Sequence, residues 1–417
     1  MRYKKLYPAV ICFCVFLAAI GLVLGDPSTV LPGLWKIIVT EDALITDYVK
    51  IAGVSAALVN SALVTLVSLL LLYLSKEPPN GFTLVELGLM AGFSLFGKNI
   101  VNIWPIIAGT FLYAKARREP FGKYVSVSLL ATALAPVVSY VALDNGFGNL
   151  WWGIAVGLLI GFVLPPLATH VHYAHKGYSL YNVGFASGII ATVVVSVMKS
   201  FGVTTESRLI WSTGNNRLFL FVLCGLFLSM MGGALVLGGK EVFAAYGRIL
   251  KTTGISGTDY LKSEGGPATT FNMGLCGLFA TLFVAAVGGD LNGPTIGGIF
   301  TIVGFCSTGK HLRNIAPIMF GVVLGGFTKH WHVNQPSPLL ALLFSTTLAP
   351  VAGEFGWIVG ILAGFLHSSV ALNVGIVYGG MNLYNNGFAG GIVAIFMVPV
   401  IHSIEDRRAR ARGEISL

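Results

Sequence analysis

The chain has 417 residues, of which 55% are hydrophobic and 10% are charged, and its formal net charge is +9. A soluble domain carries about 25% charged residues, so this chain has too few charges to cover a globular surface of its size in water. The composition therefore excludes a soluble enzyme or binding domain and indicates a protein that lies in a lipid bilayer.

A helix that crosses a bilayer needs about 20 mostly apolar residues. Five segments of the first half meet this requirement: Tyr7–Gly25, Ile51–Ser75, Lys123–Leu143, Leu150–His170 and Tyr178–Lys199. The second half has five more: Leu218–Gly238, Ala268–Gly289, Pro338–Glu354, Gly356–Asn373 and Gly379–His402. Each half also has a stretch of about 34 apolar residues, Gly81–Ala114 or Gly293–Phe327, with a Gly-Lys pair near its middle. These two stretches are too long for one crossing helix and short for two.

The two halves are related by an internal repeat. Asn80–Thr83 aligns with Asn292–Thr295, and Lys98 aligns with Lys310, at a constant offset of 212 residues. The register continues without a gap over residues 60–112 of the first half. We therefore predict a duplicated architecture with a first repeat over residues 1–210 and a second over residues 211–417.

We expect an all-α, polytopic bundle with two inverted-topology repeats. If each lysine stretch is a re-entrant hairpin, the bundle has ten spans plus two hairpins; if it makes two short crossings, there are fourteen segments. Both counts give an odd number of crossings per half, and an odd number inverts the second half relative to the first.

Loop charges predict the orientation. Four segments are rich in basic residues, and under either count of spans all four fall on the same side of the membrane. We therefore expect them in the cytoplasm: Arg2–Lys5, Lys115–Lys123, Lys240–Gly265 and the basic tail 403–417. The acidic segment with Asp26, Glu41, Asp42 and Asp47 is expected outside. The prediction is a multi-pass protein of the inner (plasma) membrane with both termini cytoplasmic.

Lys98 and Lys310 are the first candidates for a solute site. A charged side chain within hydrocarbon costs about 2.5 kcal/mol or more, so such residues usually face a cavity. Lysine in both copies of an inverted pair favours a symmetric role near the midplane, such as contact with an anion. The alternative is that both are turn lysines at the membrane edge.

Six asparagines form three pairs related by the repeat, and each lies in or at the start of an apolar run: Asn60 with Asn272, Asn102 with Asn314, and Asn182 with Asn385. An amide without a partner in lipid costs several kcal/mol, so each must bind protein, water or solute. We predict that these amides, together with Thr83 and Thr295, line the solute pathway. Hydrogen bonds between helices are the alternative.

Glu86 is the carboxylate that lies well inside an apolar run, and its repeat partner is Gly298. It is a candidate for carrying a coupling proton, or for a salt bridge to Lys98. The five cysteines and eight histidines lack the spacing of a metal site, and nucleotide-binding motifs are missing from the chain. We therefore predict no cofactor, no metal and no nucleic-acid partner.

Two strings, Phe271–Leu278 and Leu383–Phe388, contain aromatic-Asn sequences that resemble the aromatic-Asn-x-x-Leu-x-Gly segments of urea transporters. That resemblance implies inverted repeats of five spans with short re-entrant helices. As a whole, the chain resembles a bacterial family of polytopic membrane proteins known as a domain of unknown function, which implies no particular activity.

The function we expect is transport of a small polar or anionic organic solute through a midplane site between the repeats. A passive, urea-like channel is the alternative, and a membrane-embedded enzyme or scaffold is a further one. Because acid, base and metal-binding groups are sparse within the apolar segments, we expect no enzymatic activity. The expected partners are the lipid bilayer, the solute and, in a homo-oligomer, further copies of the chain.

Overall fold

The computed structural model describes residues 6–43, 45–143, 148–203, 205 and 208–412. These residues are predominantly helical, and their one bridge between extended segments joins Thr46 to Ile210. Ten helical segments are long and apolar enough to cross a bilayer, as predicted. The protein is therefore an all-α, multi-pass membrane protein.

The first half begins with α1 (Leu6–Leu24) and α2 (Val30–Ile38) and continues through the following elements: α3 (Tyr48–Leu74), α4 (Gly81–Phe93), α5 (Trp104–Arg117), α6 (Gly122–Ala131), α7 (Ala135–Leu143), α8 (Leu150–His175) and α9 (Asn182–Ser200). The short 3₁₀ turn η1 (Pro27–Thr29) precedes α2, and η2 (Thr132–Leu134) joins α6 to α7 within one span.

The second half follows the same order of long and short helices: α10 (Asn216–Gly238), α11 (Glu241–Ile249), α12 (Tyr260–Ser263), α13 (Gly266–Ala286), α14 (Gly293–Phe305), α15 (Leu312–Thr328), α16 (Pro336–Phe344), α17 (Ala349–Phe355), α18 (Trp357–Val374) and α19 (Asn385–Ala411). The 3₁₀ turn η3 (Ser345–Leu348) interrupts the span made by α16 and α17, and η4 (Gly375–Tyr378) follows α18.

The lysine stretches are interrupted where the sequence predicts. Helix α4 ends at Phe93 and α5 begins at Trp104, so the turn between them contains Lys98; α14 and α15 flank Lys310 in the same way. The 13 residues of α4 or α14 extend about 20 Å, less than the roughly 30 Å of a hydrocarbon core. Gly97 has φ of +145°, a conformation that favours glycine at the turn.

Helices α4 and α14 pack against each other at the centre of the molecule and run in opposite directions. A Cβ atom on Gly92, late in α4, would lie 2.7 Å from the carbonyl oxygen of Gly297, early in α14. A Cβ atom on Gly304, late in α14, would lie 3.1 Å from the carbonyl oxygen of Leu84, early in α4. Small residues therefore allow a close antiparallel contact between the two halves.

Glycines also form tight contacts between helices within each half. A Cβ atom on Gly161 of α8 would lie 1.9 Å from the carbonyl oxygen of Ile106 in α5, and one on Gly364 of α18 would lie 1.9 Å from that of Ile318 in α15. These glycines bring α8 against α5 and α18 against α15, so each broken segment is held by a long helix of its own half.

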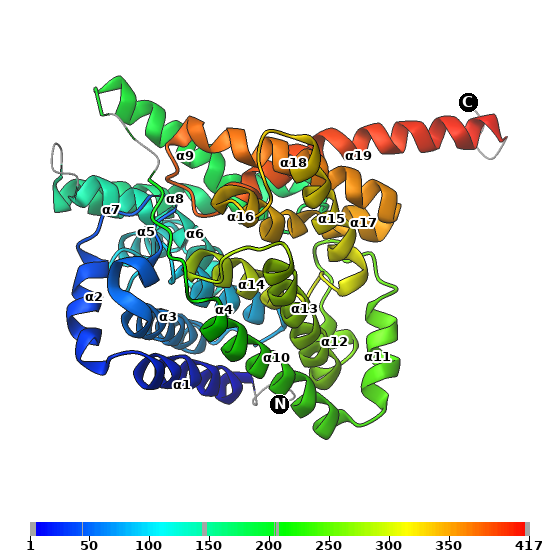
Figure 1. Cartoon of the computed structure of the whole chain (residues 1–417). Helices are drawn as coiled ribbons and strands as arrows, with labels where there is room; N and C mark the ends of the chain where they lie inside the picture. The colour runs from blue at the N-terminus through cyan, green and yellow to red at the C-terminus, as the bar shows by residue number, and fades with distance from the viewer. Residues whose placement is uncertain (1–5, 44, 144–147, 204, 206–207, 413–417) are drawn as a thin grey trace.

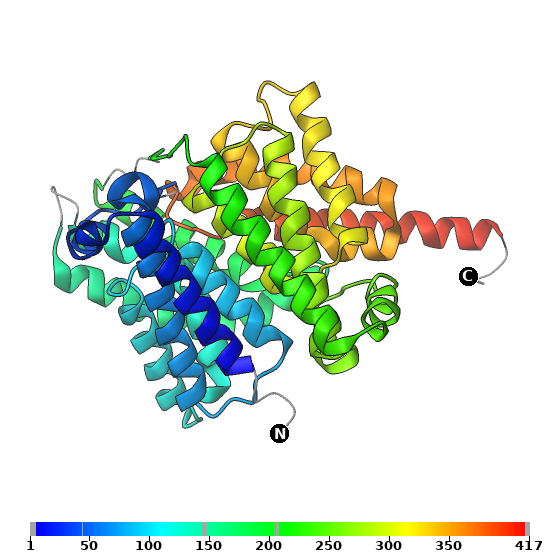
Figure 2. The same cartoon turned by 60° about the horizontal axis from the view of Figure 1, so that its bottom comes forward.

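Two short helices mark opposite ends of the bundle. In Figure 1, α2 lies at the left edge and α11 at the right edge, and both run across the direction of long helices such as α1 and α19. We call these two ends the α2 face and the α11 face. The last part of α19, which carries Arg407, Arg408 and Arg410, projects beyond the body of the protein (Figures 1 and 2).

Candidate solute site

The ammonium groups of Lys98 and Lys310 are completely buried, although both residues lie in turns. Among the described residues, neither lysine has a carboxylate partner within ion-pair distance. The proposed salt bridge between Glu86 and Lys98 is therefore not formed. A buried cation without a counter-ion is costly, and this cost singles out the two turns as a candidate site.

Lys310 is held by hydroxyl groups. Its Nζ atom donates to Tyr181 Oη at 2.5 Å and to Thr346 Oγ1 at 2.8 Å. The same nitrogen lies 4.5 Å from the centre of the Tyr181 ring and 5.1 Å from that of Phe305. These neutral oxygens and ring faces stabilise a positive charge without cancelling it.

Lys98 has an equivalent but poorer environment. Its Nζ atom lies 3.4 Å from Met90 Sδ and 5.1 Å from the centre of the Phe93 ring. Just as Lys310 binds a tyrosine of the first half, Lys98 lies near the matching tyrosine of the second half, Tyr384, whose ring packs edge-on against Phe93 at 4.8 Å. The hydroxyl of Tyr384 is buried and has no hydrogen-bond partner among the described residues. A donor-acceptor group left unpaired in this way is available to a ligand.

An aromatic cluster joins the two lysine environments. The rings of Tyr181 and Tyr384 lie 5.0 Å apart between centres, and Tyr181 also packs against Phe305 at 4.9 Å. A row of rings in contact, formed in order by Phe93, Tyr384, Tyr181 and Phe305, therefore connects Lys98 with Lys310. Sequence analysis missed both tyrosines, although the matched strings Leu180–Asn182 and Leu383–Asn385 contain them.

Four of the candidate asparagines hold the broken turns. Asn60 donates to the carbonyl oxygens of Ser94 and Lys98 at 2.7 and 2.9 Å, and Asn272 makes the equivalent pair of bonds to Cys306 and Lys310. In the second set, Asn102 donates to Gly97 and Asn314 to Gly309. These amides satisfy carbonyl groups that the interrupted helices leave free.

The other predicted contacts also serve the backbone. Asn182 donates to Ala168 and Asn385 to Ala371, each bridging neighbouring long helices. Thr83 and Thr295 belong to capping boxes at the starts of α4 and α14. Glu86 lies on α4, 1% exposed, and its Oε2 atom has no hydrogen-bond partner among the described residues.

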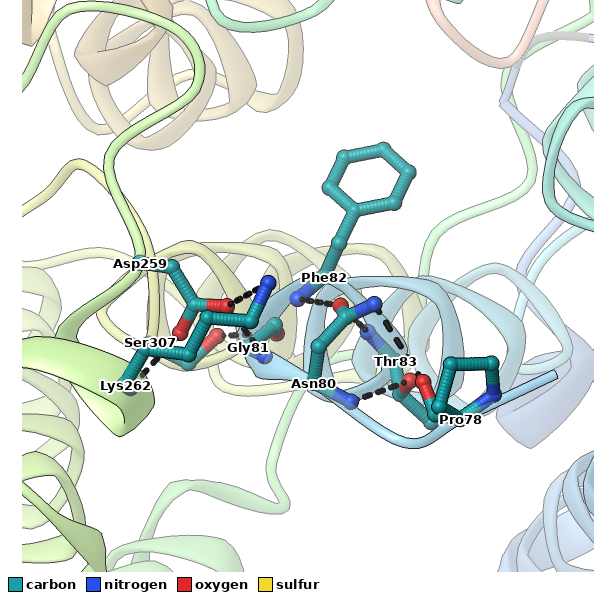
Figure 3. Close-up of polar contacts among 8 residues, drawn as sticks. All are labelled: Pro78, Asn80, Gly81, Phe82, Thr83, Asp259, Lys262 and Ser307. Atoms are coloured by element: carbon teal, nitrogen blue, oxygen red, sulfur yellow. Dashed lines mark hydrogen bonds and ion pairs between the residues drawn. The ribbon is translucent and has the colours of Figure 1, made fainter.

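The start of each short helix is capped by an aspartate of the other half. Asp259 accepts a hydrogen bond from the backbone N–H of Gly81 at 3.3 Å, and Ser307 donates to the Gly81 carbonyl at 2.6 Å. Figure 3 shows this contact at the start of α4, with the ring of Phe82 directed away from the polar groups. Asp47, which matches Asp259 in the repeat, binds the backbone N–H of Gly293 in the same way.

A vestibule leads from the α11 face toward the tyrosines. It consists of a cavity of about 340 Å³ beside Asn80, Asp259 and Thr308 and an adjoining cavity of about 160 Å³ that reaches Tyr181 and Tyr384. Phe305 lines both. The vestibule therefore provides a path from one side of the bundle to the aromatic cluster next to Lys310.

The region of the α2 face that corresponds to the 340 Å³ cavity is covered, and a smaller cavity of about 130 Å³ lies near it beside Ile45, Gly375 and Asn385. Asn292 and Asp47, which match Asn80 and Asp259, are both 0% exposed. The connector between the halves covers them, because Ser212 donates to Asp47 from its backbone N–H and its hydroxyl, at 2.9 and 2.5 Å, and accepts from Asn292 at 3.0 Å. Arg208 of the connector forms an ion pair with Glu41. We call residues 208–212 the connector seal.

Ten apolar spans around a buried, lysine-containing centre define the chain as a multi-pass membrane protein. It belongs to the DUF1576 family, proteins of unknown function, whose pattern matches residues 26–200 and 239–403. No curated protein and no solved structure has a significant match to the chain.

Proposed function

We propose that this protein is a secondary carrier for a small anionic organic solute, which binds between two inverted repeats near the middle of the membrane. The observation that carries the proposal is the pair of fully buried lysines without carboxylate partners among the described residues. An anion bound beside either ammonium group would supply the missing counter-charge and gain charge-assisted hydrogen bonds.

The proposed architecture follows from the paired contacts. Antiparallel packing of α4 on α14, with each start capped by the other half, is what a two-fold axis in the membrane plane would produce. In this arrangement α4–α5 and α14–α15 are re-entrant hairpins that approach from opposite faces. The basic segments after α5 and around α11 favour a cytoplasmic α11 face in a plasma membrane.

The one-sided vestibule favours a carrier over a urea-like channel. A passive channel needs a continuous path, whereas a carrier has a site that opens to one face at a time. Here the cavity of about 340 Å³ lies on the α11 side, and the connector seal covers the matching region on the α2 side, where a smaller cavity of about 130 Å³ lies beside Ile45, Gly375 and Asn385. If the α11 face is cytoplasmic, a cavity on this side and a covered region on the other are what an inward-open carrier would have.

The proposal can be tested in proteoliposomes with matched pairs of solutes. Acetate, succinate and benzoate would be compared with acetamide, succinamide and benzamide, and urea would test the channel alternative. We expect the parent protein to move at least one carboxylate faster than its amide. In Lys98→Met or Lys310→Met, loss of a charge-assisted contact worth about 1.5–3 kcal/mol should weaken that carboxylate's affinity about 10- to 150-fold.

Lys329→Met is the matched control, because this half-buried lysine follows α15, outside the turns that contain Lys98 and Lys310, and binds Phe365 and Ser368 on α18. It should transport like the parent. If Lys98→Met and Lys310→Met also transport every carboxylate like the parent, the lysines are topology residues. Urea flux through all three variants would then favour the passive channel.

A further inference from the structure

Asp42 is a buried carboxylate that the proposed solute site does not use. It is 0% exposed, although it lies in the loop between α2 and α3 instead of in a crossing helix. Its Oδ1 atom accepts from Tyr48 Oη at 2.8 Å, and its Oδ2 atom accepts from Ser139 Oγ at 2.9 Å and Asn102 Nδ2 at 3.1 Å. Three donors from three separate elements therefore converge on one acidic group.

This carboxylate is attached to the turn that contains Lys98. The same Asn102 amide also donates to the carbonyl oxygen of Gly97, the residue before the lysine. In the second half, Gly254 occupies the position that matches Asp42, and a Cβ atom there would lie only 2.0 Å from the Gly309 carbonyl oxygen. The repeat thus has an acidic group at one hairpin tip and no space for one at the other.

We propose that Asp42 binds the proton whose movement is coupled to solute transport. This inference rests on the proposed carrier function. The ligand is a proton instead of a metal cation because Asp42 faces three hydrogen-bond donors, and the Asn102 amino group in particular would repel a cation. Burial of the carboxylate supports the assignment, since it raises the pKa of Asp42 to about 7, although the bonds from Tyr48, Ser139 and Asn102 oppose the rise.

Few other titrating groups of the described chain face this position. Tyr48 on α3 is the titratable side chain in contact, while Ser139 on α7 and Asn102 before α5 do not ionise. The neighbouring Glu41 is paired with Arg208 of the connector seal. The ammonium group of Lys98 is directed to Met90 and Phe93 on α4. Proton binding at Asp42 therefore changes the charge of a separate site at the α2 face.

Protonation would change Asp42 from an acceptor to a donor of a hydrogen bond and so weaken its contact with the turn that contains Lys98. When a proton from water on the α2 side binds Oδ2, the neutral carboxyl group donates to Ser139 Oγ and is a weaker acceptor for Asn102. The Asn102 amide then loses one of the bonds that fix the turn beside Lys98. Proton binding also removes a negative charge near the α2 mouth, which favours arrival of an anionic solute from the same side.

Asp42→Asn tests the proposal, with Asp26→Asn as the matched control because Asp26 lies exposed at the start of η1. Proteoliposomes would take up the carboxylates of the solute panel with and without an inward proton gradient. We expect a gradient to increase accumulation at least tenfold in the parent and in Asp26→Asn, and not in Asp42→Asn. Ser139→Ala, which removes one donor that lowers the pKa, should shift the pH of half-maximal uptake upward.

A measurement without solute separates the two proposals. Since the carboxylate binds a proton more readily in the folded state, the parent should lose thermal stability as pH rises from 5 to 8, and this loss should be smaller in Asp42→Asn. A parent that moves none of the panel overturns the carrier function and the coupling with it. Gradient-driven accumulation that persists in Asp42→Asn, or is lost in Glu86→Gln instead, overturns the role of Asp42 alone.

Discussion

The two tyrosines at the centre of the molecule illustrate how equivalent residues in a duplicated chain acquire different roles. Tyr181 uses its hydroxyl to accept from Lys310, whereas the hydroxyl of Tyr384 is buried without a partner in the described structure. Both rings belong to the same aromatic cluster, with centres 5.0 Å apart. The pair therefore contrasts a hydroxyl that binds a buried ammonium group with one that has no partner among the described residues.

Replacing each tyrosine by phenylalanine should separate these roles. Tyr181→Phe leaves the Lys310 ammonium with one fewer acceptor and should lower the free energy of unfolding by about 1–3 kcal/mol. Tyr384→Phe removes an unpaired polar group and should leave that free energy unchanged or slightly higher, while it weakens uptake of the transported carboxylate. Thermal unfolding in detergent and uptake in proteoliposomes would measure both effects. Equal losses of stability would argue against a ligand-binding role for Tyr384.

At the scale of helices, tight contacts between elements depend on glycine. The matched positions Gly161 and Gly364 have no space for a side chain, because the carbonyl oxygens of Ile106 and Ile318 lie where a Cβ atom would be placed. Gly232 in α10, by contrast, faces open space, since a Cβ atom added there would meet no described atom within 4 Å. The tight contacts fix the distance between each broken segment and the long helix that supports it.

Alanine substitutions should follow this difference. Gly161→Ala and Gly364→Ala force the helices apart and should each cost about 1–3 kcal/mol of stability, as overpacked cores do. Gly232→Ala adds a better helix former in open space and should be neutral or stabilising by up to about 1 kcal/mol. Melting temperatures of the three variants would test the prediction. A stable Gly161→Ala protein would mean that α5 and α8 can separate without loss.

Elements that depend on local sequence could be predicted, and contacts between the halves could not. The ten spans and the interruptions at Lys98 and Lys310 follow from hydrophobic length and from Gly-Lys pairs within apolar runs. The repeat register also identified equivalent residues. It could not show that Asp259 caps Gly81, 178 residues away, because that contact exists only after the two halves pack together.

The candidate site shows the same limit. The paired asparagines could be identified because they lie in apolar runs. That the amide of Asn60 donates to carbonyl oxygens of the turn could not be predicted, because those carbonyl groups lie near it only in the folded protein. Burial of Asp42 was equally hidden, since its loop has an acidic composition typical of a solvent-exposed segment and only the tertiary fold brings Tyr48 and Ser139 to it. Residue type located the polar centre, and packing determined which groups there remain free.

At the scale of the whole molecule, two regions that the repeat matches differ in how far they are covered. Thr46 and Thr258 are matched by the repeat and make the same local bond, to the carbonyl oxygens of Ala43 and Ile255. Thr258 lines the vestibule, whereas Thr46 is 0% exposed beneath the connector seal. The described part of the chain has no second connector over the matching region of the α11 face. The connector seal therefore distinguishes the two faces.

Cysteine labelling should detect this difference and its reversal. In a variant without the five native cysteines, Thr258→Cys should react with a membrane-impermeant maleimide from the α11 side, and Thr46→Cys should be at least tenfold slower from the α2 side. Adding Ser212→Ala removes the hydroxyl bond to Asp47 and should raise the Thr46→Cys rate while lowering that of Thr258→Cys, since the proposed carrier would open one side as it closes the other. Fast labelling of both positions in the same membranes would instead indicate a continuous pore and contradict alternating access.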